Sequence, residues 1–210
     1  MNQTMKQAKE HIKRQKKAYL FLIILLGLGL ISGIVFIFFL SKEDSAMVKE
    51  QLRLFFEQMK NLDNLNYQKG FLNSITSNFL FAGSIFFLGI SIIGLPIVLF
   101  LLFMKGFITG FSISSIIANY QWKGILGTGA YIFPHQIINL VIWLLLTFYA
   151  ASFSIKLFSC LFLKKNINLR EAMKKFLKIF LICIIGLAIS SIIEIFVSPF
   201  LLQLFAQTVG

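Results

Sequence analysis

The 210-residue chain carries too little charge and too many apolar residues for an ordinary soluble domain. It is 58% hydrophobic and 13% charged, with 25 phenylalanines, whereas soluble domains have about 45–50% apolar and about 25% charged residues. The net charge of +12 does not indicate nucleic acid as a partner, because the lysines and arginines stand beside long apolar runs. Basic residues in such places orient a protein against the cytoplasmic leaflet. We predict an all-α integral membrane protein that contacts membrane lipids and no nucleic acid.

The first membrane span follows a basic tail. Residues 1–18 contain six basic residues and one acidic residue, and the run 19–40 contains no charge. A helix that crosses a bilayer needs about 20 apolar residues, and a signal-peptide core has roughly 7–15. No small-residue cleavage site follows, so we predict that this helix is retained. Gly29 and Gly33 lie four residues apart in it and either approach a neighbouring helix or face lipid.

The segment 41–73 is predicted to be an extracytoplasmic amphipathic helix. Apolar residues recur there at every third or fourth position, and charged residues occupy the other face, which is typical of a half-buried helix. Phe55, Phe56 and Met59 lie on the apolar stripe. Five basic and five acidic residues cancel, so the segment is not expected to bind anionic lipid. The stripe either docks a partner or folds back onto the protein's own bundle.

Residues 74–210 are predicted to form a four-helix membrane bundle. The apolar stretch from 74 to 120 is long enough for two spans. A turn at Gly94-Leu95-Pro96 divides it into runs of about 20 and about 24 residues, and proline suits the first turn of a helix. A turn at Lys105 would leave one run too short. The choice of Gly94-Leu95-Pro96 places Lys105 roughly 13 Å into the third span, at 1.5 Å per residue.

The remaining segments complete about five spans. Trp122 marks a membrane interface, where tryptophan is enriched. A glycine-rich piece near 124–134 is too short to cross the bilayer and is predicted to be re-entrant or interfacial. The fourth span is predicted at 136–163 and the fifth at 179–204, separated by a basic cytoplasmic loop at 164–178.

The basic residues predict the orientation of the chain. The tail and the 164–178 loop each contain six basic residues and one acidic residue, whereas the charges of 41–73 cancel. Four predicted crossings separate the two basic segments, so both can lie in the cytoplasm, as the positive-inside rule requires. We therefore predict a multi-pass protein of the cell membrane with a cytoplasmic N-terminus and an extracytoplasmic C-terminus.

The sequence contains no motif of a known catalytic, cofactor-binding or metal site. We predict that the protein is not an enzyme and uses neither a cofactor nor a metal ion. His135, at the outer end of the fourth span, would be the basis of an intramembrane hydrolase, but the sequence offers it no obvious nucleophile or orienting carboxylate. A hydrogen-bonded structural histidine at the interface is the favoured interpretation.

Lys105 and Glu194 are the two charges predicted to lie inside apolar spans. A charge at the centre of the bilayer costs about 2.5–3.5 kcal/mol on insertion scales, so such groups pair or reach water. The two residues could form an ion pair, extend separately to opposite surfaces, or belong to a proton or ion relay. The relay would suit a permease-like transport subunit with both charges in one intramembrane cavity.

Three sequence blocks carry a resemblance to a known family. They are LGISIIGLPIVLFLLFMKGFITGFS at 88–112, FPHQIINL at 133–140 and SIIEIFVSPFLLQ at 191–203. With the order of the spans, these blocks closely resemble the stage II sporulation protein M family of endospore-forming bacteria, over nearly the whole chain. In the wider family a glycine often follows the histidine at the start of the fourth span, and an acidic residue comes next. Gln136 and Asn139 depart from that pattern here.

The resemblance implies a role in engulfment of the forespore. It implies a membrane scaffold at the sporulation septum that recruits or anchors two peptidoglycan-degrading partners, stage II sporulation proteins D and P. Such partners lie outside the membrane, which makes Phe55, Phe56 and Met59 on the 41–73 stripe the candidate docking residues. The competing hypothesis is the transport subunit. The sequence leaves the oligomeric state open, a homo-oligomer included.

Overall fold

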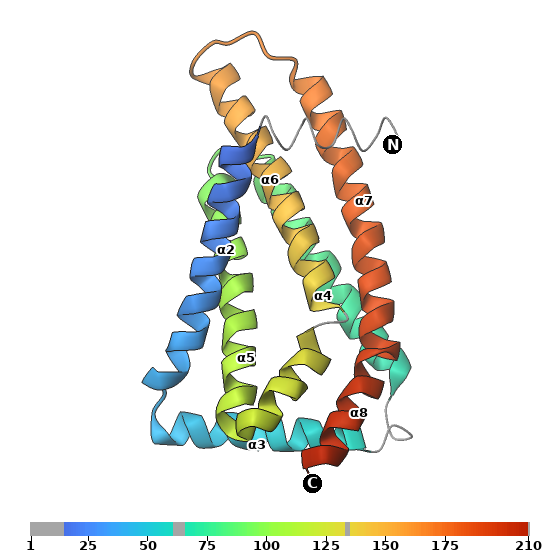
Figure 1. Ribbon diagram of the computed structural model, residues 1–210. Coiled ribbons are helices and arrows are strands. Elements are labelled where there is room, and N and C mark those ends of the chain that lie inside the picture. The colour runs from blue at the N-terminus through green and yellow to red at the C-terminus, as the bar shows by residue number, and fades with distance from the viewer. Residues whose placement is uncertain (1–14, 61–65, 133–134, 210) are drawn as a thin grey trace.

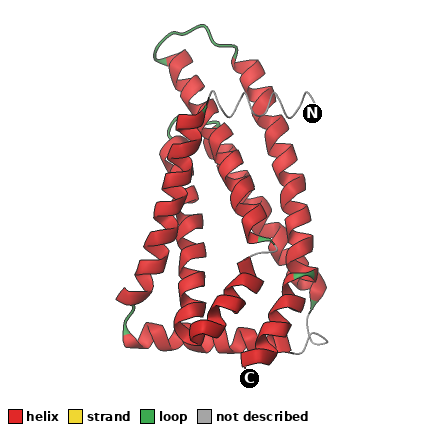
Figure 2. Cartoon of the chain, in the orientation of Figure 1, coloured by secondary structure: helices red, strands yellow, loops and turns green. Residues whose placement is uncertain are grey.

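The computed structural model describes residues 15–60, 66–132 and 135–209, and these residues contain helices and no strand. The elements in chain order are α2 (Lys16–Phe36), the short 3-10 helix η1 (Ile37–Phe39), α3 (Lys42–Lys60), α4 (Tyr67–Gly89), α5 (Gly94–Ile132), α6 (Gln136–Leu161), α7 (Leu169–Phe196) and α8 (Ser198–Val209). Figure 2 shows the helices of the described residues with the loops and turns between them.

Five helical segments of the described chain are long and apolar enough to cross a membrane. They are Lys16–Phe39, Tyr67–Gly89, Gly94–Gly129, Gln136–Leu161 and Leu169–Gln203. The prediction of an all-α membrane protein with about five spans is confirmed. In Figure 1 the long helices run between two ends of a bundle, and α3 lies across one of them. We call this the α3 end, and we call the opposite end, with the start of α2 and the α6–α7 connection, the basic end.

Glycines bring α2 and α5 into close contact along their length. A Cβ atom added at Gly29 or Gly33 would overlap the backbone of α5, and one added at Gly106 or Gly110 would overlap the backbone of α2. Small residues at such positions allow two membrane helices to approach closely, which increases their van der Waals contact. The glycine pair of the first span therefore faces a neighbouring helix and not lipid.

The turn between α4 and α5 lies at residues 90–93. It directly precedes the Gly94-Leu95-Pro96 break that the sequence favours, with Pro96 in the first turn of α5. Ser154 of α6 stabilises this turn, because its Oγ lies 2.7 Å from the carbonyl oxygen of Gly89 and 3.0 Å from that of Ser91. Carbonyl groups at the end of a helix need such donors when they are buried.

A sharp reversal divides α5. Gln121 has a positive φ of 52° with ψ −131°, a conformation that is rare for residues other than glycine. The helical piece after it folds back from the α3 end toward the middle of the bundle (Figure 1), and Gly124 lies against the backbone of Ile116. This helical piece occupies the region near 124–134 for which the sequence predicts a re-entrant or interfacial segment. Residues 133–134 lie outside the described part of the chain.

Two helices begin earlier than the sequence predicts. The 164–178 segment is a loop only up to 168, because α7 begins at Leu169. The Asn168 side chain accepts a 3.1 Å hydrogen bond from the backbone N–H of Glu171. In the same way Asn66 caps α4, accepting a 2.9 Å bond from the N–H of Lys69, and α4 starts before residue 74. Asparagine is among the strongest N-cap residues. Asn66 and Asn168 therefore set where α4 and α7 begin.

Candidate functional site

Polar side chains of several helices meet in the half of the bundle nearest α3. They belong to α4, the start of α6, α7 and α8, which converge because α6 begins in the middle of the bundle (Figure 1). We call this group the polar cluster, and its members are Ser74, Asn78, His135, Ser190, Ser191, Glu194 and Ser198. Most are buried, so their hydrogen bonds to one another offset the loss of hydration.

Glu194 is held by a serine hydroxyl of α4, which in turn contacts a serine hydroxyl of α7. Ser74 Oγ donates to Glu194 Oε2 at 2.5 Å, and the Oγ atoms of Ser74 and Ser191 are 3.0 Å apart. Asn78 Nδ2 donates to Ser191 Oγ at 3.0 Å. Because a hydroxyl has one proton, donation from Ser74 to Glu194 leaves the oxygen of Ser74 to accept from Ser191. The resulting chain of hydrogen bonds runs from Asn78 to the carboxylate and ties α4 to α7.

His135 connects the start of α6 to α7 and α8. Its Nδ1 lies 3.0 Å from Ser198 Oγ, and its carbonyl oxygen accepts a 3.2 Å bond from Ser190 Oγ. Its Nε2 is 3.9 Å from Glu194 Oε1. The structure therefore gives the ring of His135 a serine and a carboxylate as neighbours, which the sequence did not offer because they lie 63 and 59 residues away.

The cluster contains the residue types of a nucleophile, a base and an acid, but its geometry favours a structural role. In a catalytic triad the acid hydrogen-bonds to the histidine ring and orients it. Here Nε2 and Oε1 are 3.9 Å apart, which is too far for a hydrogen bond. His135 and Ser198 are each 4% exposed, so a substrate has little access to the serine.

Lys105 and Glu194 form no direct ion pair with each other in the described part of the chain. The Nζ of Lys105 lies 4.3 Å from the ring centroid of Phe81 and 5.2 Å from that of Trp143. A cation within about 6 Å of an aromatic face is stabilised by the ring quadrupole. Lys105 thus points into the bundle toward α4 and α6, whereas Glu194 is held by Ser74. Each charge has direct contacts of its own, and Glu194 still acts on Lys105 through its electrostatic field.

The apolar stripe of α3 packs against the protein itself, which corrects the docking prediction for Phe56. Phe56 is 5% exposed and packs with Ile116 of α5 and Leu202 of α8, and its ring meets that of Tyr120 with centroids 5.1 Å apart. Phe56 cannot contact a partner while α3 is in place. Phe55 is half-buried beside it. The side chain of Met59 lies outside the described part of the structure.

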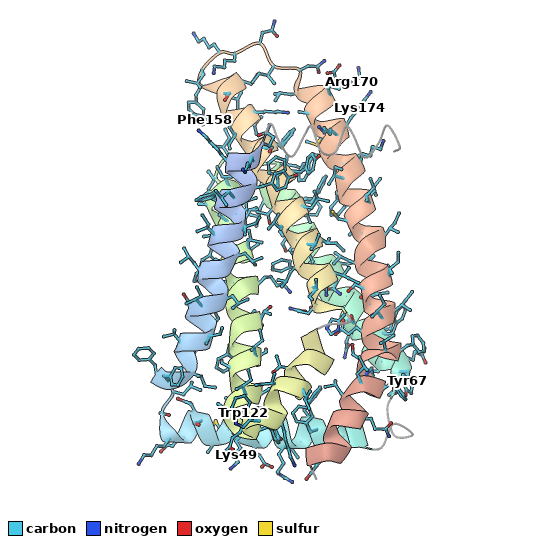
Figure 3. All side chains as sticks on the ribbon, in the orientation of Figure 1. Lys49, Tyr67, Trp122, Phe158, Arg170 and Lys174 are labelled. Carbon is cyan, nitrogen blue, oxygen red and sulfur yellow. The ribbon has the colours of Figure 1, made fainter. Side chains whose placement is uncertain are left out.

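The outward face of α3 is charged and ordered by ion pairs. The guanidinium of Arg53 bonds to Glu50 at 2.7 Å and to Glu57 at 2.6 Å. The hydrogen bond from Arg53 holds the pKa of the Glu50 carboxyl below its usual value. All three side chains are about half exposed. Figure 3 shows Lys49 and Trp122 at this same end of the bundle, and Trp122 is 85% exposed.

The described residues contain no group of three or more histidine, cysteine, aspartate or glutamate side chains that could hold a metal ion.

The structure thus defines a multi-spanning helical membrane protein with a satisfied internal polar cluster. A family-wide comparison matches residues 7–199 to the family described as Stage II sporulation protein M. The chain belongs to this family, which confirms the resemblance. Separate searches of curated proteins and of solved structures found no match.

Proposed function

We propose that this sporulation-family protein is a non-enzymatic membrane scaffold for engulfment, and that the outward face of α3 docks its partners. The partners that the family resemblance implies are the peptidoglycan-degrading stage II sporulation proteins D and P, at the sporulation septum. In this proposal the basic end lies in the cytoplasm, as the positive-inside rule predicts. The α3 end then lies outside the membrane, on the side where peptidoglycan is found.

The observation that carries the proposal is the position of α3. The helix lies across the end of the bundle (Figure 1) and is fixed there by Phe56 against α5 and α8. Its charged face, centred on Arg53 with Glu50 and Glu57, is about half exposed. A rigid helix with an ordered charged face gives a partner a surface that costs little entropy to bind.

The internal charges support a scaffold more than the alternative transport subunit. Lys105 lies over aromatic rings, and Glu194 accepts from Ser74. A relay along a transport pathway would bring the two charges to shared groups or to shared water. The direct contacts of the two charges, with aromatic rings for Lys105 and with a serine hydroxyl for Glu194, fit a role in fixing the packing of α4, α6 and α7.

The docking proposal is tested by neutralising the centre of the charged face. The variant Glu50→Gln, Arg53→Gln, Glu57→Gln keeps good helix formers and leaves Phe56 untouched. Because exposed ion pairs contribute only about 0–1 kcal/mol, we expect its membrane level on a blot to match wild type. Co-isolation of the D and P partners should fall about tenfold, the effect of losing about 1.4 kcal/mol of binding free energy. Membrane-dye microscopy should show blocked engulfment.

The matched control is Lys42→Gln, Glu43→Gln, Asp44→Asn, which removes one basic and two acidic side chains from the first turn of the same helix. It should retain partners and engulf normally. If the variant with Glu50, Arg53 and Glu57 neutralised recovers its partners fully at normal abundance, this face is not the docking site. An equal loss with both variants would show that the overall charge of α3 matters and not the ion-paired centre.

A further inference from the structure

A small cavity opens between three helices at the basic end of the bundle. Its volume is about 60 Å³, and a buried water needs about 10–15 Å³ measured in this way. The space therefore suits a group of a few heavy atoms, about the size of a phosphate. The lining residues come from the start of α2, from α6 and from α7, and they are Gln15, Phe148, Tyr149, Ser152, Phe153, Lys156, Ala172, Lys175 and Phe176.

The chemistry of the cavity is that of an anion site. Lys156 of α6 and Lys175 of α7 approach it from two helices, and Tyr149 and Ser152 contribute hydroxyl groups. The Nζ of Lys175 lies 5.6 Å from the ring centroid of Tyr149, so the ring helps to hold this ammonium group beside another lining residue of the cavity. Among the residues that the structure describes, no acidic side chain lines the cavity. Two cations at a cavity whose described lining carries no carboxylate favour a bound anion.

The position of the cavity along the helices favours a lipid as the source of the anion. Lys156 lies five residues before the end of α6 and Lys175 six residues after the start of α7, which is roughly 8–9 Å inside the helix ends. Both helices are apolar enough to cross the bilayer. At that depth the charged heads of long lysine side chains meet lipid headgroups, whereas a soluble ligand would meet the exposed 162–168 connection first.

We propose that this cavity binds the phosphate headgroup of an anionic phospholipid. Basic pockets between membrane helices are known to hold such headgroups. The buried rings of Phe148, Phe153 and Phe176 form the apolar floor of the cavity and leave the phosphate facing the two lysines. The bound lipid joins α2, α6 and α7 at the basic end, where their charges otherwise repel each other. This site is independent of the docking surface on α3.

The test uses the full chain in detergent and phosphatidylglycerol as the probe, with phosphatidylcholine of the same acyl chains as the reference lipid. Bound lipid is counted by native mass spectrometry. The variant Lys156→Gln, Lys175→Gln should bind phosphatidylglycerol about 25-fold more weakly, because each lysine near an anionic lipid contributes about a fivefold gain. The control Lys164→Gln, Lys165→Gln removes the same charge from the exposed connection at the same end and should bind like wild type.

A second variant tests whether binding needs the space of the cavity as well as its charge. Ser152→Leu fills the space without changing any charge and should also lose phosphatidylglycerol. Equal weakening by the two lysine pairs would overturn the proposal, since the binding would then follow the net charge alone. Unchanged binding in Ser152→Leu would also overturn it. Displacement of the lipid by inorganic phosphate at matched concentration would assign the cavity to a soluble phosphate and not to a lipid.

Discussion

Leucine in place of Gly33 should force α2 away from α5 and lower the free energy of unfolding by about 3 kcal/mol, the upper range for overpacking a close contact. A Cβ atom at Gly33 already overlaps the backbone of α5, which cannot move aside as a side chain could. The same contact continues through Phe36, whose ring lies 5.4 Å from that of Phe107 and 6.0 Å from that of Phe111. Separation of the helices would therefore loosen the aromatic contacts as well.

Gly27 offers a matched control on the same helix. A Cβ atom there has nothing within 4 Å, so Gly27→Leu adds the same side chain to open space. Thermal unfolding of both variants in detergent, followed by tryptophan fluorescence, gives the comparison. If Gly33→Leu unfolds at the same temperature as Gly27→Leu, the close α2–α5 contact is not what holds the first span to the bundle.

Truncation of Phe56 should release α3 from the end of the bundle. Phe56 is 5% exposed, and it fills the space between α5 and α8 beside Leu202. Phenylalanine-to-alanine changes at buried sites cost about 3–5 kcal/mol of stability. A loss of that size is comparable to the free energy that attaches one helix such as α3 to the bundle. We expect amide hydrogen exchange to rise along α3 in Phe56→Ala while the spanning helices keep their protection, and engulfment to fail because the charged face loses its fixed position.

The control for this change is Leu54→Ala, on the same helix but 40% exposed. Its exchange should match wild type, because an exposed truncation leaves no cavity. Unchanged protection of α3 in Phe56→Ala would mean that other contacts hold the helix. The original hypothesis of Phe56 as a direct docking residue would gain support only if partner binding were lost while α3 kept its protection.

Features that depend on composition and local pattern could be predicted from the sequence. Long uncharged runs predict the spans, and the 3.6-residue period of 41–73 predicts α3. A proline that suits only the first turn of a helix explains why α5 begins at Gly94. The Gly106 and Gly110 pair has the same four-residue spacing as Gly29 and Gly33, so the α2–α5 contact could have been predicted from these two matching pairs.

Features that depend on distant contacts could not be predicted. The apolar stripe of α3 can be buried in two ways, against a partner or against the protein's own bundle. Only the packing of Phe56 against Leu202 distinguishes them. The neighbours of His135 lie beyond the next loop and helix, and the ring meets Ser198 only because α6 begins inside the bundle. The early start of α7 was missed because the six basic residues of 164–178 suggested a loop, although Asn168 is a good N-cap.

The central claim is that α3 lies outside the membrane and the basic end inside, and cysteine labelling tests it most directly. Cys160 and Cys183 are first replaced by serine, because both are free thiols, and this parent protein gives the background. Single cysteines are then placed at Ser45 on α3 and at Asn166 in the α6–α7 connection, both exposed positions. An impermeant thiol reagent applied to intact cells should label Ser45→Cys and leave Asn166→Cys unlabelled until the membrane is opened. Labelling of Asn166→Cys in intact cells, with Ser45→Cys protected, would show the opposite membrane orientation. It would contradict a scaffold that presents α3 to extracytoplasmic partners.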